Sequence, residues 1–269
     1  MTSVYTGLAF SFVMFVVTWV ASVKQKDASL IDRVWGMAFV MNAWGAAAGQ
    51  GFSLVGWQWL LLLLVTIWGV RLSLHIHIRN KGHGEDYRYQ DMRAGYQSGF
   101  WWKSFFTIFM VQFLLAAVVS VPLFFTLGFD HPMNIGIMVF LGTVFWILGF
   151  YFEAWGDWQL VVFKRDPSNK GKLLNKGLWS LTRHPNYFGD GAVWWGYYLF
   201  AVSVPYGWAT IIGPIVMTLF LRKVSGVDLL EKKLKDSKPG YKEYVENTPA
   251  FIPWEGFKNP MKIIGAFRL

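Results

Sequence analysis

From Val4 to Val23 the chain reads VYTGLAFSFVMFVVTWVASV, twenty residues without a charge. A helix of about 20 apolar residues is long enough to cross a hydrocarbon core roughly 30 Å thick. A cleavable signal peptide is the other interpretation, but no basic region precedes this stretch and no small-residue cleavage site follows it. We therefore predict a first transmembrane helix here.

The composition of the whole chain agrees with a membrane protein. Of the 269 residues, 54% are hydrophobic and 15% are charged, against about 25% charged in soluble proteins. The 19% of aromatic residues suit belts at two membrane interfaces and a ring-lined pocket. With no cysteine and five scattered histidines, the sequence excludes disulfides, thiolate chemistry and Cys-ligated zinc, and we predict no metal site.

Six further apolar segments follow the first one. Gly49-Gln50-Gly51 divides one long uncharged stretch in two, and Pro205-Tyr206-Gly207 divides the last stretch into a tight hairpin. The sequence thus predicts an all-α, polytopic membrane protein of one domain, residues 1–269, whose further helices cover residues 34–49, 57–78, 104–129, 134–154 and the two halves of 191–221.

Lysine and arginine lie in alternate loops of this predicted topology. All but Arg71 of the 25 fall in four segments, residues 24–33, 79–103, 156–187 and 222–269, and none falls in the opposite loops. By the positive-inside rule, the seven helices start outside and end in the cytoplasm. The net charge of +9 then faces anionic membrane lipids, and nucleic acid is not an expected partner.

The C-terminal tail, residues 227–269, is predicted to be a cytoplasmic segment packed on the core. Val227 to Leu234 is amphipathic and suits the membrane interface. Pro239-Gly240 then turns the chain into an aromatic segment that includes Tyr241 and Tyr244, whose rings we expect to pack back onto the helices.

Ionisable residues inside a bilayer are candidates for function because an unpaired charge there is costly. On the third predicted helix, Arg71, His75 and Arg79 share one face. On the fifth, Glu153 and Asp157 share a face that continues to Lys164. Two neighbouring carboxylates require donors, which a ribose or a carboxamide can supply. Snorkelling side chains and structural ion pairs are the alternatives.

A basic loop, residues 164–176, precedes the element Arg183-His184-Pro185-Asn186-Tyr187. Pro185 suits the first turn of a helix, where free N–H groups favour an anion. We expect Arg183, His184 and the loop lysines to converge on phosphates, with the face Asn186, Asp190 and Trp194 leading to a stacked ring. No dinucleotide-binding glycine motif or Walker lysine motif occurs, so a nucleotide would need a different kind of site.

The run KLLNKGLWSLTRHPNYFGDGAVW at residues 172–194 resembles the membrane-embedded steroid 5-alpha-reductase family. The resemblance is to its bacterial branch of 3-oxo-5-alpha-steroid 4-dehydrogenase-like proteins, and it extends over most of the chain. Isoprenylcysteine carboxyl methyltransferases have a similar Arg-His-Pro-x-Tyr element and Tyr-x-x-Tyr tail. The chain therefore also resembles these methyltransferases, at the level of the superfamily. The rest of the resemblance to the reductase family lies in six other segments: Asp32 to Gly36, Glu85 to Tyr89, Glu153 to Gln159, SGVDLLEKKL, PGYKEY and TPAFIPW.

This resemblance implies a multi-pass protein, in a bacterial inner membrane, that takes NADPH from the cytosol. The reaction implied is reduction of a carbon–carbon double bond conjugated to a ketone in a steroid-like or other lipid. The cofactor-contacting positions carried over are Glu153, Asp157, Lys164, Lys172, Asn186 and Asp190, with Arg222 a weaker match; the charge and spacing of the residues add Arg183, His184, Tyr187 and Trp194.

The ketone of the substrate needs an acid or hydrogen-bond donor, because negative charge grows on its oxygen as hydride arrives. The family uses an acidic residue on the second helix and a tyrosine on the third, but no tyrosine occurs here between Tyr5 and Tyr87. The candidates are His75, Tyr89 and a protonated Asp32.

Two other functions remain open at this point. A methyltransferase using S-adenosylmethionine would need no phosphate site, and such enzymes have paired glutamates where this chain has Leu230-Glu231. A lipid-binding membrane protein without enzymatic activity would need neither the carboxylates nor the basic loop. The lysines favour a cofactor with phosphates, and therefore the reductase.

The charge asymmetry of the loops makes the topology testable. A reporter fused after Leu269 should lie in the cytoplasm. A reporter inserted near Ser53 should lie on the opposite side of the membrane. Reporters on the same side would contradict the seven-helix topology.

Overall fold

The computed structural model describes residues 1–96, 98–129, 136–224, 227, 231, 239–254, 262 and 265–266. Within these ranges the regular elements are helices, and no strand occurs. Four helices are long and apolar enough to cross a membrane, namely Thr2–Gln25, Gly56–Asn80, Phe100–Val119 and Gly136–Arg165. The prediction of an all-helical membrane protein is confirmed at this level.

The chain folds into two compact units. The first contains Met1–Val139 and Phe200–Gly213, and the second contains Phe140–Leu199 and Pro214–Leu269. The three predicted catalytic residues belong to the first unit, and the predicted cofactor-binding residues belong to the second.

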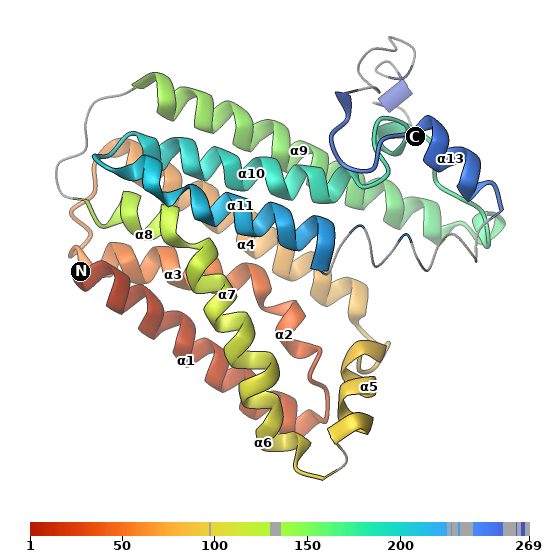
Figure 1. Ribbon diagram of the computed structural model, residues 1–269, viewed down its shortest axis with the longest axis horizontal. Helices are drawn as coiled ribbons and strands as arrows, with labels where there is room; N and C mark the ends of the chain where they lie inside the picture. The colour runs from red at the N-terminus through yellow and green to blue at the C-terminus, as the bar shows by residue number, and fades with distance from the viewer. Residues whose placement is uncertain are drawn as a thin grey trace. The chain divides into compact units, whose positions relative to one another are not determined.

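The first unit is built on three long helices, α1 (Thr2–Gln25), α3 (Trp35–Gly49) and α4 (Gly56–Asn80). Helix α3 packs against both α1 and α4 (Figure 1). The short helix α2 (Leu30–Arg33) precedes α3 and also packs against α4, and α5 (Tyr87–Tyr96) follows α4. The helices predicted at residues 4–23, 34–49 and 57–78 therefore form, with ends within three residues of the prediction.

The helix predicted at residues 104–129 is not one helix. The chain forms α6 (Phe100–Ser104), a π-helical stretch η1 (Phe105–Met110), α7 (Val111–Val119) and a separate helix α8 (Val121–Leu127). The break falls next to Pro122, which lies in the first turn of α8. Proline has no N–H and its ring clashes with the preceding turn, so it begins a helix more readily than it continues one.

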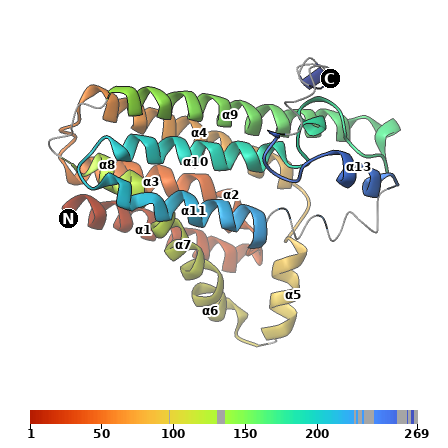
Figure 2. The ribbon, with the colours of Figure 1, turned by 45° about the horizontal axis from the view of Figure 1, so that its top comes forward.

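The second unit contains most of α9 (Gly136–Arg165) and α10 (Pro185–Val202), together with most of α11 (Ile212–Leu219) (Figure 2). Helix α10 begins at Pro185 as predicted, and Trp195 Nε1 donates to Thr218 Oγ1 of α11 at 3.2 Å. The helix predicted to end at residue 154 instead continues to Arg165, because no helix-breaking residue occurs before Asp166-Pro167.

Shorter elements complete the described part of the chain. They are η2 (Pro167–Asn169) and η3 (Gly177–Ser180) between α9 and α10, η4 (Gly207–Ile211), the π-helical stretch η5 (Phe220–Val224), and α13 (Tyr241–Asn247). Of the amphipathic segment predicted at residues 227–234, only Val227 and Glu231 lie within the described residues.

Helices α9 and α10 approach closely at glycine. A Cβ atom on Gly189 would lie 2.4 Å from Glu153 N and 2.4 Å from Gly149 O, both on α9. A Cβ on Gly149 would in turn lie 2.6 Å from Gly189 O. Small residues allow such close backbone contact between helices in a membrane. The contact brings the acidic face of α9 against the first turns of α10.

The segment after α13 lies against the start of α10. Tyr244 donates its hydroxyl hydrogen to Trp179 O, and Thr182 Oγ1 donates to Phe251 O at 2.9 Å. The ring of Phe251 lies 6.2 Å from that of Phe188 in an edge-on arrangement. Side-chain donors and aromatic packing thus hold Tyr241–Trp254 in the second unit.

Replacing Gly189 by alanine should separate α9 from α10. Because the Cβ would meet backbone atoms of α9, Gly189→Ala should lower the free energy of unfolding by about 1–3 kcal/mol, as overpacked sites do. Thermal unfolding in detergent measures this. Gly95→Ala on α5 is the control, because a Cβ atom there would have no neighbouring atom within 4 Å. Equal melting temperatures for the two variants would contradict the close contact.

Candidate functional site

Three buried acidic residues of the second unit lie on α9 and α10, the two helices that touch at Gly149 and Gly189. Glu153, Asp157 and Asp190 are 2%, 6% and 8% exposed. Asn186, in the first turn of α10, donates from Nδ2 to Asp157 Oδ1 at 2.9 Å and accepts from Tyr187 N at 3.0 Å. Buried carboxylates accept charge-assisted hydrogen bonds, which are stronger than bonds between neutral groups. This carboxylate cluster, Glu153, Asp157 and Asp190, is therefore suited to hydroxyl and amide donors.

The predicted basic loop encloses a cavity of about 400 Å³. Lys172 and Lys176 contribute to its lining, whereas Lys164 is exposed at the last turn of α9. Apolar side chains form much of the remaining wall, including Val162, Phe163, Leu173 and Leu174. Asp166 and the amides of Gln159, Asn169 and Asn175 complete the lining. The lysines and the apolar side chains together would suit a ligand that has both an anionic group and a ring.

Arg183 directs its donors to the tail. Nε and Nη2 donate to the two carboxylate oxygens of Glu231 at 2.8 and 3.1 Å. Nη1 donates to Val245 O and Thr248 O. A paired guanidinium and carboxylate of this kind is among the stronger hydrogen-bonded contacts in proteins.

His184 shares the same glutamate. Its Nε2 lies 3.2 Å from Glu231 Oε1, and its ring stacks on Tyr187 with 5.6 Å between ring centroids. The residue is 3% exposed. Burial of the Glu231 carboxyl raises its pKa, but hydrogen bonds from His184 and Arg183 outweigh burial and lower the pKa to about 2. Glu231 is consequently ionised at neutral pH.

The two remaining predicted positions on this side have different surroundings. Trp194, two turns along α10 from Asn186, is fully buried. Arg222 is exposed, and its Cζ atom lies 5.7 Å from the centre of the Phe251 ring. Arg222 therefore makes a cation–π contact with the tail.

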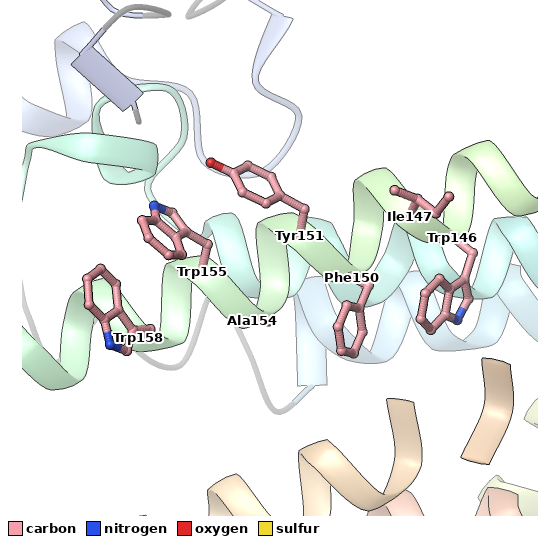
Figure 3. A pocket seen from close by; sticks show the side chains of 7 residues that line it. All are labelled: Trp146, Ile147, Phe150, Tyr151, Ala154, Trp155 and Trp158. Atoms are coloured by element: carbon pink, nitrogen blue, oxygen red, sulfur yellow. The ribbon is translucent and has the colours of Figure 1, made fainter. Parts of the chain in front are cut away.

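An aromatic groove runs along another face of α9 (Figure 3). It encloses about 440 Å³ and is lined by Trp146, Ile147, Phe150, Tyr151, Ala154, Trp155 and Trp158. The rings of Trp146 and Phe150 stack at 4.7 Å, and those of Trp155 and Trp158 approach to 4.4 Å. Such a surface is suited to apolar molecules with flat ring systems.

The first unit holds two of the three predicted catalytic residues in direct contact. Tyr89 donates from its hydroxyl to Asp32 Oδ1 at 2.7 Å and accepts from Gln112 Nε2 at 3.2 Å. Arg88 Nη2 donates to Asp32 Oδ2 at 2.7 Å and Nε donates to Asp86 Oδ1 at 2.9 Å. The side chains of Asp32, Asp86, Arg88, Tyr89 and Gln112 form one polar network.

Burial controls the titration of this network. It raises the pKa of Asp32, although the charge of Arg88 and the hydrogen bond from Tyr89 act in the opposite direction. Burial also raises the pKa of Tyr89, and the neighbouring Asp32 carboxylate raises it further. Tyr89 therefore keeps its proton at neutral pH. His75, the third predicted residue, lies partly exposed on α4.

Several residues of these sites were not among those selected from the sequence. Arg88, Gln112 and Glu231 make the contacts that hold Tyr89, Asp32, Arg183 and His184. The sequence marks Glu231 in one way, because it is a single acidic residue followed by Lys232 and Lys233. Nothing in the sequence marks Gln112 as functional, because a glutamine in an apolar helix can have many different roles.

The fold and these sites define an all-helical membrane protein with buried polar clusters. Residues 18–248 match the family described as protein of unknown function (DUF1295), and the chain belongs to that family.

Two proteins of Schizosaccharomyces pombe are similar to the chain. "Uncharacterized protein C594.04c" is 23% identical over 281 residues, which cover 92% of this chain and 78% of that protein. "Delta(14)-sterol reductase erg24" is 28% identical over 104 residues, which cover 32% of this chain and 24% of the reductase. The chain thus matches about a quarter of the reductase, and no solved structure matches it.

The contacts of Glu231 predict an acid-sensitive tail. Its pKa lies at about 2 in the folded protein against an ordinary 4.5, so its contribution to stability is complete above pH 4.5 and is lost as the pH falls toward 2. Melting temperatures measured across this range should fall more steeply for the wild type than for Glu231→Gln. Glu246→Gln, an exposed acid on α13, should behave as the wild type. A wild-type slope in Glu231→Gln would contradict the pairing.

Proposed function

We propose that the protein is a membrane-embedded, NADPH-dependent reductase that acts on a carbon–carbon double bond conjugated to a ketone in a steroid-like or other lipid. The observation that carries this proposal is the combination, within the second unit, of buried carboxylates and a cavity lined by lysines. Hydroxyl and amide donors and phosphates occur together in a nicotinamide dinucleotide. The partial similarity to a sterol reductase supports the coarser part of the proposal, a reductase that acts on a lipid.

The described residues fit such a cofactor by their chemistry. Lys172 and Lys176 would hold phosphate, since ammonium groups in a cavity with apolar walls attract an anion. Glu153, Asp157 and Asp190 would accept hydrogen bonds from ribose hydroxyls or from the carboxamide. Lys164, Asn186, Tyr187, Trp194 and Arg222 remain proposed cofactor-binding residues on the strength of the family resemblance and their positions.

NADPH would supply the hydride that reduces the β carbon of the conjugated ketone. The chain must then stabilise the negative charge that grows on the ketone oxygen. Tyr89 is a proposed donor because its raised pKa keeps it protonated at neutral pH. Asp32 is another, because burial favours its protonated form. His75 is a third candidate.

The proposal includes the topology expected from the loops. Seven helices, with the N-terminus outside and the C-terminus in the cytoplasm, would bring the lysines of the basic loop to the compartment that contains NADPH. A bacterial inner membrane is the proposed location, and membrane lipids and the lipid substrate are the proposed partners.

Titration of the purified protein in detergent tests the proposal against its main alternative. The wild type should bind NADPH, measured by the fluorescence of the reduced nicotinamide, and should not bind S-adenosylmethionine, measured by calorimetry. Binding of S-adenosylmethionine alone would establish the methyltransferase alternative. Binding of neither would leave a lipid-binding protein without a cofactor.

Lysines of the basic loop should distinguish NADPH from NADH. Lys172 lines the cavity, and NADPH has one phosphate more than NADH. Lys172→Ala should therefore lower the affinity for NADPH about tenfold, as for the loss of a charged contact of about 1.5 kcal/mol, and lower the affinity for NADH much less. Lys170→Ala is the matched control, since Lys170 is exposed in the same loop and is not among the residues that line the cavity. Equal losses for both cofactors would contradict a phosphate contact.

A further inference from the structure

Helices α9 and α10 remain in close contact beyond the acids of the candidate site. A Cβ atom on Gly196 would lie 2.8 Å from Gly142 O and 3.0 Å from Trp146 N, both on α9. Gly189, which comes earlier in α10, is close to Glu153, which comes later in α9. Residue numbers therefore rise along one helix as they fall along the other, and the two helices run antiparallel.

Tyr197 lies inside this contact. It is fully buried, and Trp146 is nearly so. Trp146 Nε1 donates to the Tyr197 hydroxyl oxygen at 3.0 Å. Because an indole nitrogen can donate but cannot accept, the hydroxyl hydrogen of Tyr197 must be directed to a different group. Buried polar groups in folded proteins are hydrogen-bonded as a rule, so a group close to Tyr197 accepts this hydrogen.

Two acids are close enough to Tyr197 to act on it electrostatically, Glu153 and, more weakly, Asp190. Glu153 follows Trp146 on α9 by about two helical turns. Side chains tilt toward the N-terminus of their own helix. Glu153 therefore tilts toward the level of Trp146, and Tyr197, on the antiparallel helix, tilts toward the level of Glu153. These two side chains converge, whereas Asp190 is on the same helix as Tyr197 and has a shorter side chain.

We propose that Tyr197 is a positioning residue: its hydroxyl donates to the carboxyl group of Glu153, while Trp146 holds the phenol in place. The bond would fix the direction in which the second carboxyl oxygen of Glu153 faces a ligand. The inference rests on the proposed function, in which Glu153 accepts a hydrogen bond from a ribose hydroxyl or the carboxamide of the cofactor. A carboxyl group already held by Tyr197 loses less rotational freedom when the cofactor binds, which favours binding.

Infrared spectroscopy of the protein without cofactor tests the hydrogen bond itself. The C–O stretching band of the Tyr197 phenol is identified from the difference between the wild type and Tyr197→Phe, because this band responds to the group that accepts the hydroxyl hydrogen. We expect the band to shift in Glu153→Leu, which removes the acceptor, and to stay unchanged in Asp190→Leu. An equal shift in Asp190→Leu, or no shift in Glu153→Leu, would overturn the assignment to Glu153.

Cofactor affinity tests the positioning role. Tyr197→Phe should weaken NADPH and NADH by the same factor, about fivefold, as for the loss of one hydrogen bond, because Glu153 contacts a part that both cofactors share. Trp146→Phe, which keeps the phenol but removes its support, should have a smaller effect in the same direction. Tyr198→Phe is the matched control, because Tyr198 is the next residue of α10 and its ring contacts Trp195. It should bind both cofactors as the wild type does.

The double variant separates positioning from general support of the fold. In a Glu153→Leu background, adding Tyr197→Phe should cost no further affinity, because the bond is already absent. A further fivefold loss there, or unchanged affinity in a folded Tyr197→Phe variant, would overturn the positioning role. If the wild type binds neither cofactor, the proposed function and the positioning role fail together, whereas the infrared result still decides whether the hydrogen bond exists.

Discussion

The interior of a bilayer offers no water to backbone N–H and C=O groups, and the other features of this protein depend on that constraint. Each apolar stretch long enough to cross the hydrocarbon must satisfy its hydrogen bonds internally, which a helix does. Four helices of the described chain meet this condition, from Thr2–Gln25 to Gly136–Arg165. Once the backbone is satisfied in this way, polar side chains in the same segments are left to form specific contacts.

In the second unit these contacts depend on how closely two helices approach. Gly149 and Gly189 have no side chains, so the backbones of α9 and α10 touch. Glu153, Asp157 and Asp190 are buried beside this contact, and Asn186 pairs with Asp157 at 2.9 Å. A larger residue at either glycine would force the two helix backbones apart. The small residues therefore set how the acids of α9 lie against α10.

The second unit also uses its charged groups in two different ways. Lys172 and Lys176 contribute to the lining of a cavity, together with Asp166. Arg183 is instead bound to Glu231 and to carbonyl groups of the tail. From the sequence alone, all these cations were expected to meet a phosphate. The difference arises because a planar guanidinium can bind a carboxylate and carbonyl oxygens at once, and Glu231 comes from a distant part of the chain.

The sequence by itself determined the helical class, the membrane location of the long apolar segments and the start of α10 at Pro185, because all three follow from local composition and local backbone chemistry. It also selected Asp32, His75 and Tyr89 as alternative donors to a substrate ketone. Only the tertiary structure decided that Tyr89 donates to Asp32, that Gln112 donates to Tyr89, and that Glu231 holds Arg183 and His184. These partners lie 23 to 57 residues apart in the chain, and no local pattern specifies which distant side chain completes a buried hydrogen bond.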